Sequence, residues 1–151
     1  MIAGRPAGQG GFVFEDIARD QLKLVVARDH PLFGRDSVGW TELAAFAFIA
    51  MSTSSSVQRL TDAGFIHANV QTVPIYELDQ ISCAAALAAA GLGVTALPTM
   101  TFAMFNADEL TAIPLVAPRI ERSTGMTWLK KDRALSASAI KFVAVLRDRR
   151  A

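Results

Sequence analysis

The sequence has little of the residues on which several kinds of site depend. It contains one cysteine and two histidines among 151 residues. A single cysteine excludes a framework of internal disulfides and is typical of a protein in a reducing compartment. His30 and His67 are far apart, and no HExxH or CxxC motif accompanies them, so the sequence predicts no metal site. Cys83 lies among alanines, which favours a buried small side chain over a reactive thiol.

An excess of charge of one sign and long apolar runs are also missing. The formal net charge is +1, which excludes a global basic field for binding nucleic acid. Charged residues, Gly or Pro interrupt every apolar run before it reaches membrane-spanning length, and the first residues contain no apolar signal core. We therefore expect a cytoplasmic protein without a membrane segment. A hydrophobic share of 52% predicts that the chain folds.

Motifs of catalysis and of cofactor binding are missing too. Residues 91–96, GLGVTA, match the spacing of the dinucleotide fingerprint. That fingerprint requires a strand before the glycines and a helix after them, whereas the pattern here predicts the reverse order. No G-x-S-x-G nucleophile elbow occurs, and the acidic residues show no spacing that selects a catalytic pair. We therefore predict a protein that is not an enzyme and that binds no cofactor.

What the sequence does contain is a strand–helix–strand pattern near its centre. The β-branched and aromatic residues at 70–76 predict a buried strand. Gly91 and Gly93 mark the end of the following helix, because a left-handed C-cap favours a residue without Cβ. A short apolar strand then ends at Pro98. Four residues at helical spacing define the helix between the two strands: Ile81, Ala84, Ala85 and Ala88.

A unit of this length predicts a crossover between two parallel strands. Open α/β sheets bind ligands at the carboxyl ends of such strands. The loops at those ends are residues 77–79 and 98–101.

Before this unit, the apolar run at 22–27 predicts a buried strand, and the run at 46–51 predicts another. Ser37 is a candidate N-cap for a short helix that buries three residues: Trp40, Leu43 and Ala44. A further helix begins near Val57 and is expected to end at Gly64.

After the central unit, Thr99–Phe105 is compatible with a short helix that packs Phe102 and Met104 into the core. Strands are expected at 110–116 and 125–129, and Ser136 is expected to begin a last helix. One face of that helix carries apolar residues at the i, i+3, i+4, i+7 spacing: Ala139, Phe142, Val143 and Leu146.

Residues 52–56, STSSS, form a hydroxyl cluster between a predicted strand and a predicted helix. Hydroxyl groups together with the exposed amides of a first helical turn make a ready anion site. The same composition is typical of a helix cap in a solvent-exposed loop. From the residues alone, the cap is the favoured interpretation.

The order of these segments resembles one protein family. The segments LKLVVARDHPLF at 22–33, STSSS at 52–56, YELDQ at 76–80 and GLGVTALP at 91–98 follow one another. In this order and spacing they resemble the effector-binding domain of LysR-type transcriptional regulators. The resemblance covers nearly the whole chain, and it reverses the preference at the hydroxyl cluster, because this turn lines the effector cleft in the family.

The resemblance implies an α/β fold: a two-lobed effector domain like a type 2 periplasmic-binding protein, with its first lobe incomplete. Residues 1–29 would enter the first lobe, residues 30–106 would form the second lobe, and residues 107–151 would return to the first lobe with a C-terminal helix. The ligand would lie in the cleft between the lobes. The resemblance implies the following ligand-binding residues: Ser52, Thr53, Ser54, Ser55, Tyr76, Glu77, Leu78, Pro98 and Thr99.

By the same resemblance, the chain is an N-terminally truncated ligand-sensing domain of a transcriptional regulator, and its effector is a small organic anion, expected to be a carboxylate. Family members form homodimers or tetramers. No helix-turn-helix is found in this sequence, so no DNA contact is implied for this chain itself, and no membrane partner is expected. Two other interpretations stay open: a solute-binding module of a transport system, which shares the two-lobed fold, and a non-functional truncated remnant.

Overall fold

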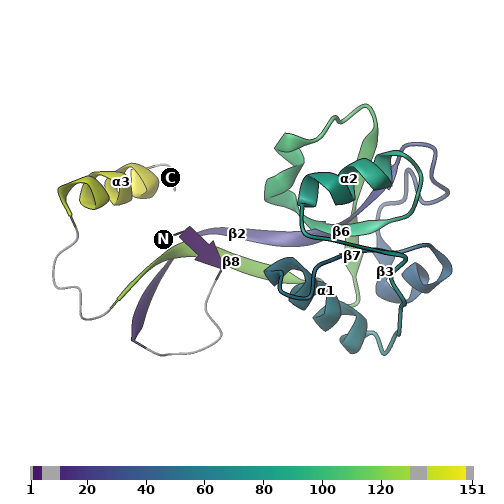
Figure 1. Cartoon of the computed structure of the whole chain (residues 1–151), viewed down its shortest axis with the longest axis horizontal. Coiled ribbons are helices and arrows are strands. Elements are labelled where there is room, and N and C mark those ends of the chain that lie inside the picture. Colours follow the sequence, from purple (N-terminus) through teal and green to yellow (C-terminus); the bar gives the residue numbers. More distant parts are fainter. Residues whose placement is uncertain (1, 5–10, 130–135, 149–151) are drawn as a thin grey trace. The chain divides into compact units, whose positions relative to one another are not determined.

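The computed structural model describes residues 2–4, 11–129 and 136–148 (Figure 1). The chain divides into two compact units. Unit 1 consists of Met1–Asp20 and Glu121–Ala151, and unit 2 is Gln21–Ile120. One long strand, β2 (Phe12–Ala27), begins in unit 1 and ends in unit 2.

Unit 1 is built from strand pairs. Strand β1 (Ile2–Gly4) pairs antiparallel with β8 (Glu121–Leu129), and β8 is also the neighbour of β2. Gly125 of β8 has no room for a side chain, because a Cβ there would collide with the backbone carbonyl of Glu15 in β2. Helix α3 (Ala137–Asp148) belongs to the same unit.

The sheet of unit 2 is arranged around the second part of β2. Strands β6 (Thr95–Pro98) and β7 (Leu110–Val116) pair antiparallel with β2, and β3 (Val38–Gly39) lies parallel to β7. Strands β4 (Ile49–Met51) and β5 (Tyr76–Leu78) form a parallel pair. A parallel bridge between Phe48 and Val94 joins this pair to the chain entering β6. The order in space is therefore β5-β4-β6-β2-β7-β3.

Two helices make the crossovers of this sheet. Helix α1 (Ser56–His67) connects β4 to β5, and α2 (Ile81–Ala89) connects β5 to β6. Right-handed crossovers that step in opposite directions place their helices on opposite faces, and Figure 1 shows α1 and α2 on the two sides of β6. The strands of unit 2 and the residue that precedes β6 supply fully buried apolar side chains: Leu24, Val26, Val38, Ile49, Val94 and Leu97.

Trp40 holds α1 in place against the rest of unit 2. It begins the 3₁₀ helix η1 (Trp40–Ala45), is fully buried, and donates from Nε1 to the carbonyl of Pro118 at 2.8 Å. Its ring meets Phe65 of α1 edge-on, with 5.1 Å between centroids. Gly64 permits this approach, because a Cβ at that position would collide with the indole ring.

Several sequence predictions are confirmed. The run at 22–27 is the inner part of β2, and residues 110–116 are β7. The chain segments on both sides of α2 run parallel to β4, as a crossover unit requires. Gly91 follows α2 with φ 73°, the left-handed conformation expected of a C-cap. At the start of α3, the hydroxyl of Ser136 accepts the N–H of Ala139 at 3.2 Å.

The strand predicted over residues 70–76 is wrong in its extent. Strand β5 begins only at Tyr76, and Val73 and Ile75 are 88% and 60% exposed. The partner strand sets this limit, because the register pairs Tyr76 with Ile49, the first residue of β4. Residues with high strand propensity stay irregular where no neighbouring strand is available.

Two predicted helix boundaries are also wrong. Helix α1 does not end at Gly64 but continues to His67, since the glycine serves the contact with Trp40 instead of a cap. The helix expected after Ser37 begins at Trp40. There the side chain of Glu42, at the third helical position, accepts the N–H of the N-cap residue Gly39 at 2.9 Å, so the helix start is stabilised from within the helix and not by a serine hydroxyl.

Some side chains lie on the opposite side from the one predicted. Cys83 and Ala44 are exposed, and Met104 is 73% exposed. The 3₁₀ helix η2 (Thr99–Met104) buries Phe102 only in part. In these short elements a small change in helical phase decides which side chains face the core. In α3, Phe142 is 52% exposed, although its neighbours on the predicted face are half-buried.

Candidate functional site

The carboxyl ends of β4, β5 and β6 define the candidate site in unit 2. The three segments are parallel, because β4 pairs with β5 in parallel and Phe48 bridges Val94 in parallel. Each strand is followed by polar residues at the same edge: Ser52 after β4, Asp79 after β5 and Thr99 after β6. This is the edge at which open α/β sheets hold ligands.

Residues 52–55, here called the hydroxyl turn, join β4 to α1. The N–H of Ser52 donates to the carbonyl of Leu78 at 2.8 Å, which ties the turn to β5. The N–H of Ser55 then donates to the carbonyl of Ser52 at 2.8 Å. The hydroxyl of Ser55 accepts the N–H of Val57 at 3.1 Å and so caps α1. Ser55 is therefore the N-cap of α1, as the cap interpretation predicts. The other hydroxyls of the turn do not cap the helix.

Those other hydroxyls lie close together. The hydroxyls of Ser52 and Ser54 are hydrogen-bonded to each other at 3.1 Å, a bond that a ligand oxygen would replace, and Thr53 and Ser54 are exposed to solvent. Two adjacent hydroxyls at the start of a helix can donate to one ligand oxygen or to a pair of them. The turn therefore offers a short row of neutral donors next to the positive end of the α1 dipole.

Two charged side chains touch the hydroxyl turn. The N–H of Thr53 donates to Oε1 of Glu77 at 3.3 Å, and Nη1 of Arg59 donates to the carbonyl of Ser54 at 3.2 Å. Glu77 thus holds an amide that an anionic ligand could otherwise use. Arg59 places a positive charge at the same turn. The site can accept an anion whose oxygens bond the hydroxyls while its charge faces Arg59.

Gln58 separates β4 from β6 at this edge. Its Oε1 accepts the N–H of Met51 at 2.8 Å, and its Nε2 donates to Asp62 at 2.7 Å. The pairing of β4 with the chain entering β6 stops after the bridge at Phe48, because the amide of Met51 bonds to this side chain instead. The buried Gln58 therefore fixes where the hydroxyl turn leaves the sheet.

The structure brings together most of the residues predicted for the ligand. Ser52, Thr53, Glu77 and Leu78 are joined by hydrogen bonds, although Leu78 takes part through its backbone carbonyl. Tyr76 is 38% exposed on the edge strand β5. Pro98 is buried and ends β6, with its carbonyl accepting the hydroxyl of Thr101 at 2.6 Å. A role in ligand binding stays a prediction for all of these residues, including Pro98 and Thr99.

Arg59 and Gln58 were missed by the sequence interpretation. Both lie in the first turns of α1, and the N–H of Arg59 bonds to the carbonyl of Ser55. The sequence signal for Arg59 was its position one helical turn after the N-cap Ser55. Because side chains of a helix tilt toward its N-terminus, this spacing brings the guanidinium back to the loop before the helix.

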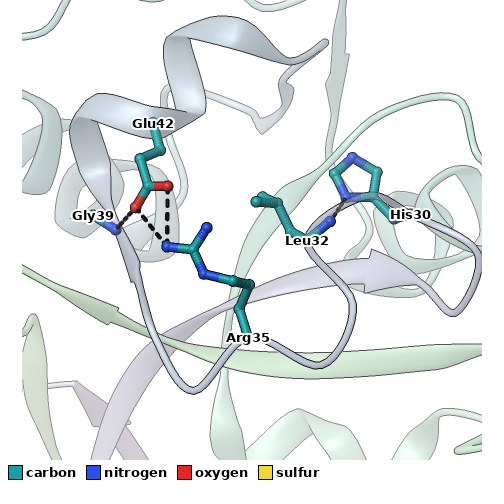
Figure 2. A network of polar contacts seen from close by, with 5 residues as sticks. All are labelled: His30, Leu32, Arg35, Gly39 and Glu42. Carbon is teal, nitrogen blue, oxygen red and sulfur yellow. Dashed lines mark hydrogen bonds and ion pairs between the residues drawn. The ribbon is translucent and has the colours of Figure 1, made fainter.

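A separate polar network, shown in Figure 2, supports the chain between β2 and η1. Nη2 of Arg35 lies 3.2 Å from Glu42, and the N–H of Gly39 bonds the same carboxylate. The hydrogen bond from Gly39 and the charge of Arg35 lower the pKa of Glu42. Nδ1 of His30 accepts the N–H of Leu32 at 3.2 Å, and desolvation lowers the pKa of His30 despite the neighbouring Asp29. These groups stabilise a loop.

Over the described ranges 2–4, 11–129 and 136–148, no group of three or more potential acidic, histidine or cysteine ligands is arranged to hold a metal ion. Every helix in those ranges is too short or too polar to span a bilayer.

The comparison with protein families agrees with this geometry. Residues 1–151 match the model of the LysR substrate binding domain. The chain belongs to this family. Its relatives include two uncharacterized HTH-type transcriptional regulators. YbhD of Escherichia coli is 32% identical over 133 residues, and YybE of Bacillus subtilis is 32% identical over 123 residues.

The chain spans about two fifths of the length of these relatives. The match to YbhD covers 88% of this chain and 42% of YbhD. The match to YybE covers 82% of this chain and 41% of YybE.

Solved structures of LysR regulatory domains share the fold. The CcmR regulatory domain of Synechocystis PCC6803 in complex with 2-PG gives a TM-score of 0.88 at 23% identity, covering 98% of this chain and 71% of that one. The effector binding domain of QuiR in complex with shikimate gives 0.83 at 22% identity, covering 97% and 69%. The α/β fold of the type 2 periplasmic-binding-protein class, expected from the sequence, is therefore confirmed.

Proposed function

We propose that this chain is a ligand-sensing part of a LysR-type transcriptional regulator and that its hydroxyl turn binds a small organic anion. The observation that carries the proposal is the pair of Ser52 and Ser54 hydroxyls 3.1 Å apart at the carboxyl end of β4, with Arg59 bonded to the same turn. CcmR and QuiR, of the same fold, were solved with 2-PG and with shikimate, which supports a small molecule as the ligand.

The arrangement favours an anion that carries several oxygens. The hydroxyls of Ser52 and Ser54 supply directional donors, and Arg59 supplies charge. Glu77 opposes binding, because its carboxylate already accepts the N–H of Thr53 and repels a second negative charge. The ligand must therefore displace Glu77 from this amide or bond the hydroxyls beside it.

A thermal-shift screen of small carboxylates on the whole chain tests the proposal. A binding carboxylate should raise the free energy of unfolding by about 2.7 kcal/mol at one hundred times its dissociation constant. Ser52→Ala and Ser54→Ala should abolish the shift, because they remove the hydroxyl donors. Glu77→Gln should increase it, because it removes the opposing charge.

Thr41→Ala is the matched control, since Thr41 is an exposed threonine of η1 in the same unit. It should leave the shift unchanged. A shift that survives Ser52→Ala and Ser54→Ala, or that Glu77→Gln weakens, would place the anion elsewhere and contradict the proposal.

Ligand sensing is proposed here in place of catalysis, since members of the family are transcriptional regulators. Assembly into homodimers or tetramers, which the resemblance implies for the family, also stays a prediction for this chain, and α1 with the segment after it is a candidate surface. That region exposes Ile66, Val73 and Ile75, as a surface that pairs with a second copy would. A cytoplasmic location and the assignment of residues to two family lobes likewise remain predictions.

A further inference from the structure

A cavity that is open to solvent lies in unit 2 at the connection from β6 to β7, and exposed residues such as Arg28, Asn106 and Ala107 form part of its wall. Its volume is about 270 Å³. Strands β6 and β7 pair with opposite sides of β2, so residues 99–109 must cross over one face of β2 to connect them. In the register of β2 with β7, Val25 pairs with Ala112 and Ala27 with Leu110, which places these residues on one face of the sheet. The residues lining the cavity include Val25, Leu110 and Ala112 from that face and Phe102 and Phe105 from the crossover.

Arg28 is the charged residue of the cavity wall. It directly follows β2, and its Nε and Nη2 both donate to the carbonyl of Ala107, at 3.0 and 2.8 Å. The ring of Phe33 lies 5.7 Å from the guanidinium carbon. These contacts fix the guanidinium plane at the wall before any ligand arrives.

No carboxylate of the described residues pairs with Arg28, although Asp29, Asp108 and Glu109 are close to it or to Ala107 in the sequence. The carboxylate of Glu109 instead accepts through Oε1 from Nδ2 of Asn106, another residue of the cavity lining, at 3.0 Å. The Nε–Nη2 edge of Arg28 is occupied by Ala107, and the edge formed by Nη1 and the second N–H of Nη2 carries no hydrogen bond to a described residue. That edge has the fork geometry that binds a carboxylate through two parallel hydrogen bonds.

We propose that this cavity is a second ligand site, separate from the hydroxyl turn, which binds a small monocarboxylate with a flat apolar group. The ring would lie between the face of β2–β7 and the two phenylalanines, and the carboxylate would bond the open edge of Arg28. A cavity of about 150 Å³ lined by apolar side chains is large enough to hold benzene. The volume of about 270 Å³ therefore accommodates one six-membered ring with its carboxylate.

Titration calorimetry of the whole chain with benzoate tests the inference. Benzoate should bind, and acetate should bind at least tenfold more weakly, because it cannot fill the cavity. Arg28→Lys keeps the charge but loses the fork, and we expect it to weaken benzoate binding about tenfold or more. Ala112→Leu fills the cavity without changing Arg28 and should abolish binding, so the inference stays testable if Arg28→Lys fails to fold.

Arg119→Lys is the matched control, because Arg119 is an exposed arginine of the same unit that lines neither the cavity nor the hydroxyl turn. It should leave benzoate binding unchanged. If Arg59→Lys weakens benzoate while Arg28→Lys and Ala112→Leu do not, benzoate binds at the hydroxyl turn; the cavity site is then overturned and the proposed function is supported. Unchanged binding to Ala112→Leu, or no binding of benzoate to the wild-type chain, also overturns the inference and leaves the test at the hydroxyl turn unaffected.

Discussion

The two units of the chain are stabilised in different ways. Among the described residues, every buried hydrophobic residue except Met126 lies in unit 2. Unit 1 instead contains a buried Asp20 paired with Arg122 at 3.0 Å, and its helix α3 exposes Ile140 and Phe142 by more than half. Burial of apolar surface is the main favourable term in folding. Unit 2 therefore has the core needed for independent order, whereas the described part of unit 1 depends on strand pairing and on polar contacts such as the ion pair of Asp20 with Arg122.

Trp40→Ala should give the largest effect, and it should be confined to unit 2. Removing a fully buried indole costs about 3–5 kcal/mol of unfolding free energy, and here it also leaves the edge-on contact with Phe65 unmade. Amide hydrogen exchange should accelerate in η1 and α1.

A double-mutant cycle with Gly64→Ala tests the reason. Gly64→Ala alone should be destabilising, because its Cβ collides with the indole of Trp40. In the Trp40→Ala background it should cost little or even stabilise, because the collision is gone. Equal costs in both backgrounds would mean that Gly64 does not serve the contact with Trp40.

Asp20→Asn should give the next largest effect, and it should act on unit 1. The carboxylate of Asp20 is fully buried, and its Oδ2 accepts hydrogen bonds from both Nε and Nη2 of Arg122. Breaking a buried ion pair by removing one partner costs about 3 kcal/mol or more. Exchange should accelerate in β8, while the amides of α1 and α2 keep their protection. Glu121→Gln, an exposed neighbour in β8, is the control and should change little; the same acceleration there would refute the ion pair as the cause.

Thr95→Val should stabilise unit 2 slightly. Thr95 is 1% exposed, and its hydroxyl has no hydrogen-bond partner among the described residues. A valine of the same shape removes this unpaired group, so the unfolding free energy should rise by about 1 kcal/mol in chemical denaturation. Thr61→Val is the matched comparison, because the equally buried Thr61 donates to the carbonyl of Val57 at 3.0 Å. A gain of the same size at Thr61 would show that the unpaired hydroxyl is not the cause.

The sequence could predict a feature whose cause lies within one segment, but not a feature whose cause lies far away along the chain. Helix α2 and strand β7 were predictable because their signals lie within the segment: alanines at helical spacing in one, a short apolar run in the other. The family resemblance added the α/β class through the order of four segments. The role of Gly64 was not predictable, because it depends on Trp40, which lies 24 residues earlier and meets it only in the folded chain.

For the candidate site, the residue types were predictable but their roles were not. A serine before a helix indicates a cap, and Ser55 caps α1. Which other hydroxyls stay available depends on β5, whose Leu78 carbonyl holds the amide of Ser52. That Glu77 bonds the amide of Thr53 follows from the parallel pairing of two strands about 25 residues apart, with Ala50 opposite Glu77. Long-range register of this kind is not visible in local periodicity.

Glu42→Gln should give the smallest effect, visible only as a change in pH dependence. The pKa of Glu42 is lowered from its ordinary value of 4.5 by the N–H of Gly39 and by Arg35, so folding favours the ionised form. This contribution to stability is fully present above about pH 4.5 and is lost as the pH falls through the lowered pKa.

Glutamine keeps an oxygen for Gly39 but carries no charge. Wild type should therefore be more stable than Glu42→Gln at neutral pH, and the difference should shrink on acidification, as measured by denaturation at a series of pH values. Arg35→Gln should reduce the difference at neutral pH, because one source of the shift is gone. A difference that stays constant from neutral pH to pH 3, or that grows on acidification, would exclude the ionised carboxylate as a stabilising group of unit 2.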